Sequence, residues 1–126
     1  MRKLVALMKI RKDVPFVEAR RMYEEEHVPL VMQLMPMIKD YRRNYLSVAR
    51  AYIPSSEVLP DFDVVTELWF DTASELEAFL NRIRNGEEGR RLREDSRRFL
   101  IGGTTRMFDV DEVVTLRVVD WAQRDG

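Results

Sequence analysis

The sequence predicts an α+β protein of the ferredoxin-like βαββαβ type, with a four-stranded antiparallel sheet and two helical regions on one of its faces. The first observation is the order of the segments, which read as strand, helix, strand, strand, helix, strand. The second is a length of 126 residues, from which we expect one domain over residues 1–126. The third is the composition, since 45% hydrophobic and 34% charged residues are typical of globular chains.

The first strand is expected at residues 4–10, where an apolar run has the length of a strand. Val5 and Leu7 fall on one face of this strand. The opposite set is also largely apolar, so both faces need to be covered by other parts of the protein. That set is Leu4, Ala6, Met8 and Ile10.

The first helical region begins after residues 13–15, where a proline suits the first turn of a helix. Pro29 lies inside the helical pattern, cannot donate a hydrogen bond to the carbonyl of Glu25 and disfavours helical geometry at Val28. We therefore expect the helix to kink or restart beside His27. The apolar or amphipathic positions recur in steps of three and four, at Phe16, Ala19, Tyr23, His27, Leu30, Val31 and Leu34.

The second and third strands are expected at residues 37–50 and 63–70, joined by a turn-rich surface loop at residues 51–60. The alternation of the second strand is imperfect, although Tyr41 and Tyr45 fall within it. The third strand alternates clearly. Its one face carries Val64, Thr66, Leu68 and Phe70, and the other carries Val65, Glu67 and Trp69.

The second helical region begins with the capping box of residues 72–75 and is interrupted at residues 85–86. A short, charged helix is expected at residues 87–100. A turn at residues 102–103 then leads to the last strand, expected at residues 106–119 with apolar residues on both faces. The apolar positions of the first of these helices are Leu76, Phe79, Leu80 and Ile83.

The apolar strand faces predict a homodimer. Two helical regions can cover only one face of a four-stranded sheet, and monomers rarely expose a large apolar patch. We therefore expect the second face to pack against the same face of another subunit.

The charge balance disfavours several other partners. The 21 basic and 22 acidic residues give a net charge of −1, so we expect neither nucleic acid nor a membrane as a partner. No apolar run approaches the ~18 residues of a membrane span, and the basic N-terminus lacks a signal-peptide pattern. The chain has no cysteine, which excludes disulfides and suits the reducing cytoplasm, where we expect the protein.

His27 is the only histidine and the first candidate for chemistry. An imidazole with a pKa near 6.5 can act as an acid or a base near neutral pH. The alternative is a buried structural histidine that satisfies a carbonyl group, such as the one that Pro29 leaves free at Glu25. Glu24 lies about one turn away and would raise the pKa of His27 if the two side chains met.

The remaining polar residues suggest no metal-binding, phosphate-binding or second catalytic site. With one histidine and no cysteine, no ligand-spaced motif indicates a metal site, and we expect none. No phosphate-binding glycine loop or nucleophile motif is present. Acidic residues interleave with the arginines of the second helical region, which indicates a salt-bridged surface. These arginines are Arg82, Arg84, Arg90, Arg91, Arg93, Arg97 and Arg98.

Three segments resemble the EthD family of the dimeric α+β barrel superfamily. They are YEEEHVPL at residues 23–30, Tyr41-x-x-Asn44, and DVVTELWFD at residues 63–71. The order of these segments and their separation along the chain make a chance match to the family unexpected. The resemblance continues through Gly89, Asp95 and Phe99 and covers nearly the whole chain.

The resemblance implies a dimeric α+β barrel with a pocket between the sheet and the helices, where His27 is the recurring polar residue. Related barrels include cofactor-free cyclases, decarboxylases, dehydratases and lactone isomerases that act on aromatic or polyketide-like molecules. We therefore expect no cofactor and a small aromatic or hydrophobic ligand. His27 is the catalytic candidate. The candidates for substrate binding are Tyr23, Tyr41, Asn44, Trp69 and Phe99.

The mechanism expected on this basis is proton transfer by His27, while Asn44 or Tyr23 stabilises a developing oxyanion. The alternative is a binding or accessory protein of a degradation pathway, which uses the same pocket without turnover. A haem-dependent or cofactor-free oxygenase, as in other branches of the superfamily, has less support because its distinguishing residues are not identifiable in the sequence.

Overall fold

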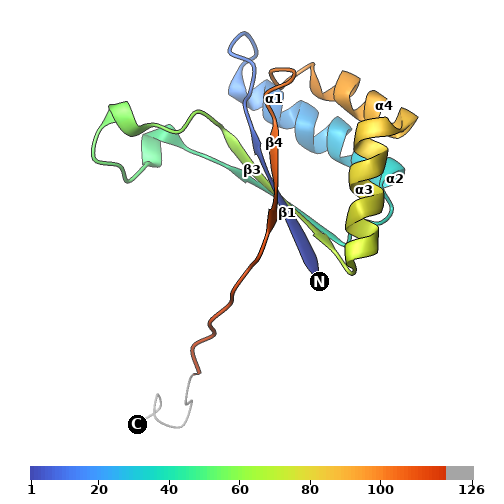
Figure 1. The fold of residues 1–126 in the computed structure, drawn as a ribbon. Coiled ribbons are helices and arrows are strands. Elements are labelled where there is room, and N and C mark those ends of the chain that lie inside the picture. Colours follow the sequence, from blue (N-terminus) through green and yellow to red (C-terminus); the bar gives the residue numbers. More distant parts are fainter. Residues whose placement is uncertain (119–126) are drawn as a thin grey trace.

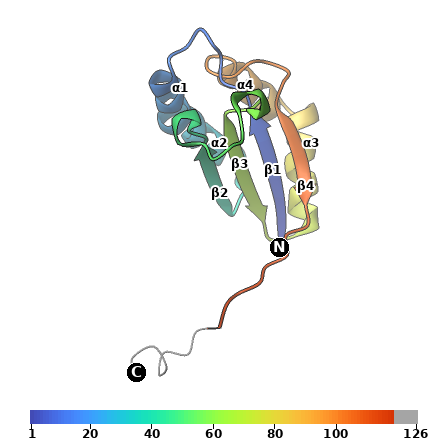
Figure 2. The same ribbon diagram turned by 90° about the vertical axis from the view of Figure 1, so that its left-hand side faces the viewer.

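The computed structural model describes residues 1–118 and confirms the ferredoxin-like α+β fold. One sheet has the strand order β2-β3-β1-β4, and each neighbouring pair of strands is antiparallel. The α-helices lie on one face of this sheet, and the other face is open in the single chain (Figure 1; Figure 2). The strands are β1 (Arg2–Met8), β2 (Asp40–Tyr45), β3 (Val64–Phe70) and β4 (Arg106–Val110).

The helical regions each contain two segments. A π-helical turn joins α1 to α2, and Gly86 separates α3 from α4. No helix within residues 1–118 has both the length and the apolar character that crossing a membrane requires. The segments are α1 (Phe16–Met22), the π turn (Tyr23–His27), α2 (Val28–Leu34), α3 (Ala73–Asn85) and α4 (Glu87–Ser96).

The π turn confirms the expected change of helical geometry beside His27, although the helical region is not interrupted. The N–H of Val28 donates to the carbonyl of Tyr23, five residues earlier, as in a π-helix. Pro29 then lies at the start of α2, where its missing N–H costs little. The wider turn therefore lets the chain pass the proline and remain helical.

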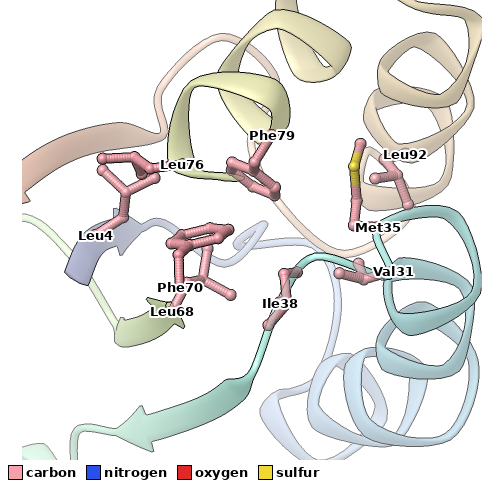
Figure 3. Packing of buried hydrophobic residues seen from close by; sticks show 9 residues of the cluster. All are labelled: Leu4, Val31, Met35, Ile38, Leu68, Phe70, Leu76, Phe79 and Leu92. Carbon is pink, nitrogen blue, oxygen red and sulfur yellow. The ribbon is translucent and has the colours of Figure 1, made fainter. Parts of the chain in front are cut away.

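The buried faces of β1 and β3 follow the alternation expected from the sequence. Residues under the helices are buried on both strands, and the residues between them are partly exposed on the open face. Helices α2, α3 and α4 contribute the remaining side of the main core, opposite β1 and β3 (Figure 3). That core consists of Leu4, Val31, Met35, Ile38, Leu68, Phe70, Leu76, Phe79 and Leu92.

A second buried cluster lies beside the π turn. It joins β1 and β3 to α1 and to the residues that follow α4. Its members include Tyr23 and Phe99, which are among the candidate site residues. This cluster therefore supports the part of the fold that contains His27.

Helix α4 packs closely on α3 at Gly89, which is buried. A Cβ atom at this position would lie 2.3 Å from the carbonyl oxygen of Ile83 and 2.4 Å from that of Arg82. Both neighbouring atoms belong to the backbone and cannot rotate away. The approach of the two helices therefore depends on the absence of a side chain here.

Two expected strands are shorter than the sequence pattern indicated. The second strand was expected over residues 37–50 but ends at Tyr45, and a loop with two short 3₁₀ turns follows. The last strand was expected over residues 106–119 but ends at Val110, which pairs with Lys3 near the start of β1. Beyond Lys3 almost no partner strand remains, so residues 111–118 have no regular structure. Residue 119 lies outside the described residues.

Candidate functional site

The π turn places His27 against α4, where its side chain is only 8% exposed. The Nδ1–H group of His27 donates to Oδ2 of Asp95 over 2.8 Å. Because an ionised carboxylate only accepts hydrogen bonds, the neutral ring carries its proton on Nδ1 and has a free lone pair on Nε2. Burial lowers the pKa of His27, and the hydrogen bond to Asp95 partly opposes this shift. His27 is therefore an uncharged base at neutral pH.

Asp95 is itself held in place by Arg98. The guanidinium of Arg98 donates to Oδ1 of Asp95 over 2.7 Å from Nη2 and 3.1 Å from Nε. Arg98 also reaches Glu26, with 3.2 Å between the nearest atoms. The carboxylate that orients His27 is thus anchored on its other oxygen, and the imidazole has little freedom to turn.

A cluster of three hydroxyl groups lies near His27 on the helix-covered face of the sheet. The hydroxyl of Tyr23 lies 2.9 Å from those of Tyr41 and Thr66, and 3.4 Å from Sδ of Met8. Burial raises the pKa of both tyrosines, and that of Tyr41 lies well above its usual value. If Thr66 donates to Tyr23 and Tyr23 donates to Tyr41, the proton of Tyr41 is free to bind a ligand.

His27 and two members of this hydroxyl cluster, Tyr41 and Thr66, face a common cavity of about 130 Å³. His27, Tyr41 and Thr66 supply polar groups to its wall, and most of the remaining wall is apolar. Because the cavity is largely apolar, charges that develop inside it interact strongly with its few polar groups. The apolar lining includes Leu68, Phe79 and Met107.

Tyr23 and Phe99 support the imidazole ring and do not line the cavity. The ring centroids of Tyr23 and His27 lie 5.5 Å apart, and those of His27 and Phe99 lie 5.3 Å apart, both in edge-to-face geometry. Both aromatic residues are almost fully buried. Of the sequence candidates, His27 and Tyr41 therefore line the cavity, while Tyr23 and Phe99 position the histidine.

The structure does not bring Asn44 and Trp69 together with His27 in the single chain. Side chains alternate between the two faces of a strand, and both residues lie on the open face. The side-chain amide of Asn44 donates to the carbonyl of Val65 over 2.9 Å. The ring of Trp69 lies between Lys3, with Nζ 4.6 Å from its centroid, and Arg42, with Cζ 4.7 Å away.

Glu24 does not contact His27 either, although their spacing of about one helical turn had allowed such a contact. Its carboxylate accepts hydrogen bonds from the guanidinium of Arg43 and the hydroxyl of Tyr45. The bond from Arg43 lowers the pKa of Glu24 and keeps it ionised. The carboxylate partner of His27 is Asp95 instead.

Two members of the site received no role from the sequence. Thr66 could have been found, because it is a polar residue on the otherwise apolar face of β3. Asp95 lies 68 residues from His27 in a helix rich in charged residues. Apart from the family resemblance, no local pattern distinguishes it from its acidic neighbours.

Comparisons with known proteins agree with this fold. Residues 12–103 match the EthD domain. A solved EthD family protein from Bacillus halodurans has 20% sequence identity and a TM-score of 0.61, and covers 90% of this chain and 100% of its own. A protein from Arabidopsis thaliana has 9% identity and a TM-score of 0.65, with coverage of 93% and 100%. No curated protein matches the chain.

A third solved structure bears on assembly. It is a protein of unknown function from Bacteroides fragilis, described as dimeric with a ferredoxin-like fold. It has 13% identity and a TM-score of 0.54, and covers 88% of this chain and 95% of its own. At such low identities, these likenesses show the fold alone.

Proposed function

Because the chain belongs to the EthD domain family, we propose that it carries out acid/base chemistry on a small organic molecule bound beside His27. The observation that carries this proposal is the His27–Asp95 pair at the wall of a largely apolar cavity. A partly buried carboxylate that fixes the tautomer of a neutral imidazole leaves the other ring nitrogen free to act as a general base. The site residues are His27 as the base, Asp95 as its positioning residue and Tyr41 as a hydrogen-bond donor.

The proposed reaction begins with proton transfer to Nε2 of His27 from an acidic carbon or hydroxyl group of the ligand. Asp95 stabilises the imidazolium that forms, and the hydroxyl of Tyr41 stabilises the negative charge left on a ligand oxygen. His27 then returns the proton to another carbon, which gives an isomer. When the proton came from a carbon, His27 can instead protonate a hydroxyl group on the adjacent carbon as its C–O bond breaks, so that water leaves and a carbon–carbon double bond forms. Tyr41 takes the oxyanion role that the sequence had assigned to Asn44 or Tyr23.

The cavity limits the group that can reach His27. Its volume of about 130 Å³ is close to the roughly 150 Å³ that holds one benzene molecule. An aromatic or lactone ring therefore fits, and we propose an isomerase, dehydratase, cyclase or decarboxylase type of reaction on such a compound. The role of the protein would then lie in catabolism or secondary metabolism.

The test of this proposal is a panel of aromatic acids, lactones and hydroxyquinones in deuterated water. We expect at least one compound to raise the melting temperature, because it binds only the folded state, and to incorporate deuterium at one carbon by NMR. The variant Met107→Trp fills the mouth of the cavity and should suppress both effects. Val17→Trp, at a 79% exposed position on α1, is the control.

The outcomes of this panel are distinct. Stabilisation without deuterium exchange or product would favour the binding or accessory protein over the enzyme. If Met107→Trp binds the compound as tightly as the unaltered protein, the ligand does not occupy this cavity and the proposal is wrong.

We also propose a homodimer that forms through the open face of the sheet. Figure 1 shows that residues 111–118 and the loop between β2 and β3 project on the side away from the helices. Within the described residues, four apolar side chains of residues 111–118 are exposed. The dimeric description of a protein with the same fold supports this assembly. The apolar residues of the open face include Val5, Leu7, Val65 and Phe108.

The dimer is tested by sedimentation velocity at micromolar concentration. We expect the unaltered protein to sediment as a dimer and Phe108→Glu, at a 51% exposed position, to shift it towards the monomer. The reason is that an unpaired carboxylate would be buried at the interface. Val17→Glu on α1 is the charge-matched control. A monomeric unaltered protein would contradict the prediction.

Four further expectations stay predictions from the sequence. These are the absence of a metal, the absence of a cofactor, the absence of nucleic-acid and membrane partners, and a cytoplasmic location. Within residues 1–118, no three acidic or histidine side chains gather in a way that could hold a metal ion.

A further inference from the structure

A larger hollow adjoins the His27 cavity. It has a volume of about 420 Å³ and shares Ile83, Arg93, Ser96, Leu100, Thr105 and Met107 with the wall of the smaller cavity. The two hollows therefore lie on either side of one set of residues. We call the larger one the arginine vestibule, because Arg84, Arg93 and Arg97 complete its wall.

The three arginines of the vestibule have no carboxylate partner among the described residues. Their neighbours differ, since Arg90 pairs with two glutamates and Arg98 pairs with Asp95. The salt-bridged surface expected from the sequence is thus confirmed for Arg90 and Arg98 but wrong for the vestibule. An unneutralised group of three guanidinium groups beside a cavity attracts anions.

One of these arginines is held by the backbone beside it. The guanidinium of Arg93 donates to the carbonyl oxygen of Ile83 near the end of α3. The position of Arg93 on the vestibule wall is therefore partly fixed before a ligand binds, which lowers the entropic cost of binding. The side chain of Arg97 lies beside Gly102.

We propose that the arginine vestibule binds the carboxylate of the substrate, so that the substrate class is a ring-containing carboxylic acid. This inference rests on the proposed function. The inner cavity holds about one ring, and a larger substrate can extend past Met107 into the vestibule, because this residue lines both hollows. The fork of a guanidinium group matches the two oxygens of a carboxylate, and charge-assisted hydrogen bonds of this kind are strong.

The test compares acids with their uncharged amides. Benzoate, phenylacetate and 3-phenylpropanoate place a carboxylate at increasing distance from one ring, and each has a matching amide of similar shape. We expect at least one acid to bind about tenfold more tightly than its amide by calorimetry at low salt. Arg84→Gln combined with Arg97→Gln should remove this preference and leave the affinity for the amide unchanged.

The control variant is Arg91→Gln. Arg91 is an exposed arginine of α4 that does not line the vestibule. It should retain the preference for the acid. The inference is overturned if acids and amides bind the unaltered protein equally, if none of the six compounds binds, or if the double variant retains the preference.

Binding of these acids and amides, together with deuterium exchange into the compounds of the first panel, separates this inference from the proposed function. His27→Gln should retain the preference for the acid and lose deuterium exchange. If exchange depends on His27 but acids have no advantage, the proposed function stands and the vestibule assignment fails. If the acid preference depends on the arginines but no exchange depends on His27, the vestibule stands and the acid/base function fails.

Discussion

Replacing His27 with glutamine is expected to lower turnover by about 100- to 10,000-fold, the usual contribution of a general acid or base. Glutamine can still donate a hydrogen bond to Asp95, but it cannot take up a proton. The free energy of unfolding should fall by only about 1–2 kcal/mol, because the ring already faces a cavity. Activity and urea denaturation measured on the same variant test both parts.

The pH profile gives a second measurement of the same role. Burial lowers the pKa of His27 below its ordinary value of 6.5, so the folded protein favours the neutral ring. The stability that this provides is present above pH 6.5 and is lost as the pH falls through the lowered pKa. The acidic limb of the activity profile should therefore lie below pH 6.5. In Asp95→Asn it should move to still lower pH, because the imidazolium loses its charged partner.

A structural histidine behaves in the opposite way. Its replacement would leave Asp95 without a partner and open a void in the core, which costs several kcal/mol. A large loss of stability in His27→Gln, with activity or ligand affinity unchanged in the folded fraction, would therefore show that the acid/base role is wrong.

Replacing Gly89 with alanine is expected to lower the free energy of unfolding by about 3 kcal/mol or more. The added Cβ atom would lie within 2.4 Å of two backbone carbonyl oxygens of α3. Helices α3 and α4 would have to separate, and the contacts of Leu92 with the main core would weaken. Urea denaturation followed by circular dichroism measures the loss.

The direction of this change is informative, because helix propensity alone predicts the reverse. Alanine in a helix is about 1 kcal/mol more favourable than glycine. Arg91→Ala on the exposed side of α4 is the control and should change stability by less than about 0.5 kcal/mol. A Gly89→Ala variant as stable as the unaltered protein would show that α3 and α4 can part without cost.

The parts of the fold that follow local periodicity could be predicted from the sequence. The two-residue alternation of β3 correctly separated Thr66 and Leu68 from Trp69. The helical spacing of Tyr23 and His27 correctly directed both side chains to the interior. In these segments, the position of a residue within its own strand or helix is enough to decide whether its side chain is buried.

The parts that depend on a distant segment could not be predicted in this way. The end of β4 depends on where β1 begins, because a strand persists only while it has a partner. The contact of His27 with Asp95 requires α4 to pack on the π turn. The placement of Asn44 failed for a local reason. The family resemblance assigned both Tyr41 and Asn44 to the pocket, but two residues three positions apart on one strand lie on opposite faces.

The π turn at Tyr23–His27 has a consequence for insertions and deletions in related chains. A π-helical hydrogen bond joins residues five apart in the chain, whereas an α-helical hydrogen bond joins residues four apart. The π turn therefore contains one residue more than an α-helical turn. The turn can therefore absorb one extra residue while α1 and α2 keep their apolar sides on the sheet. A relative that lacks one residue here can close the turn as ordinary α-helix, and its alignment gap belongs between Tyr23 and His27. In such a relative, a histidine at the aligned position would sit at a different angle around the helix.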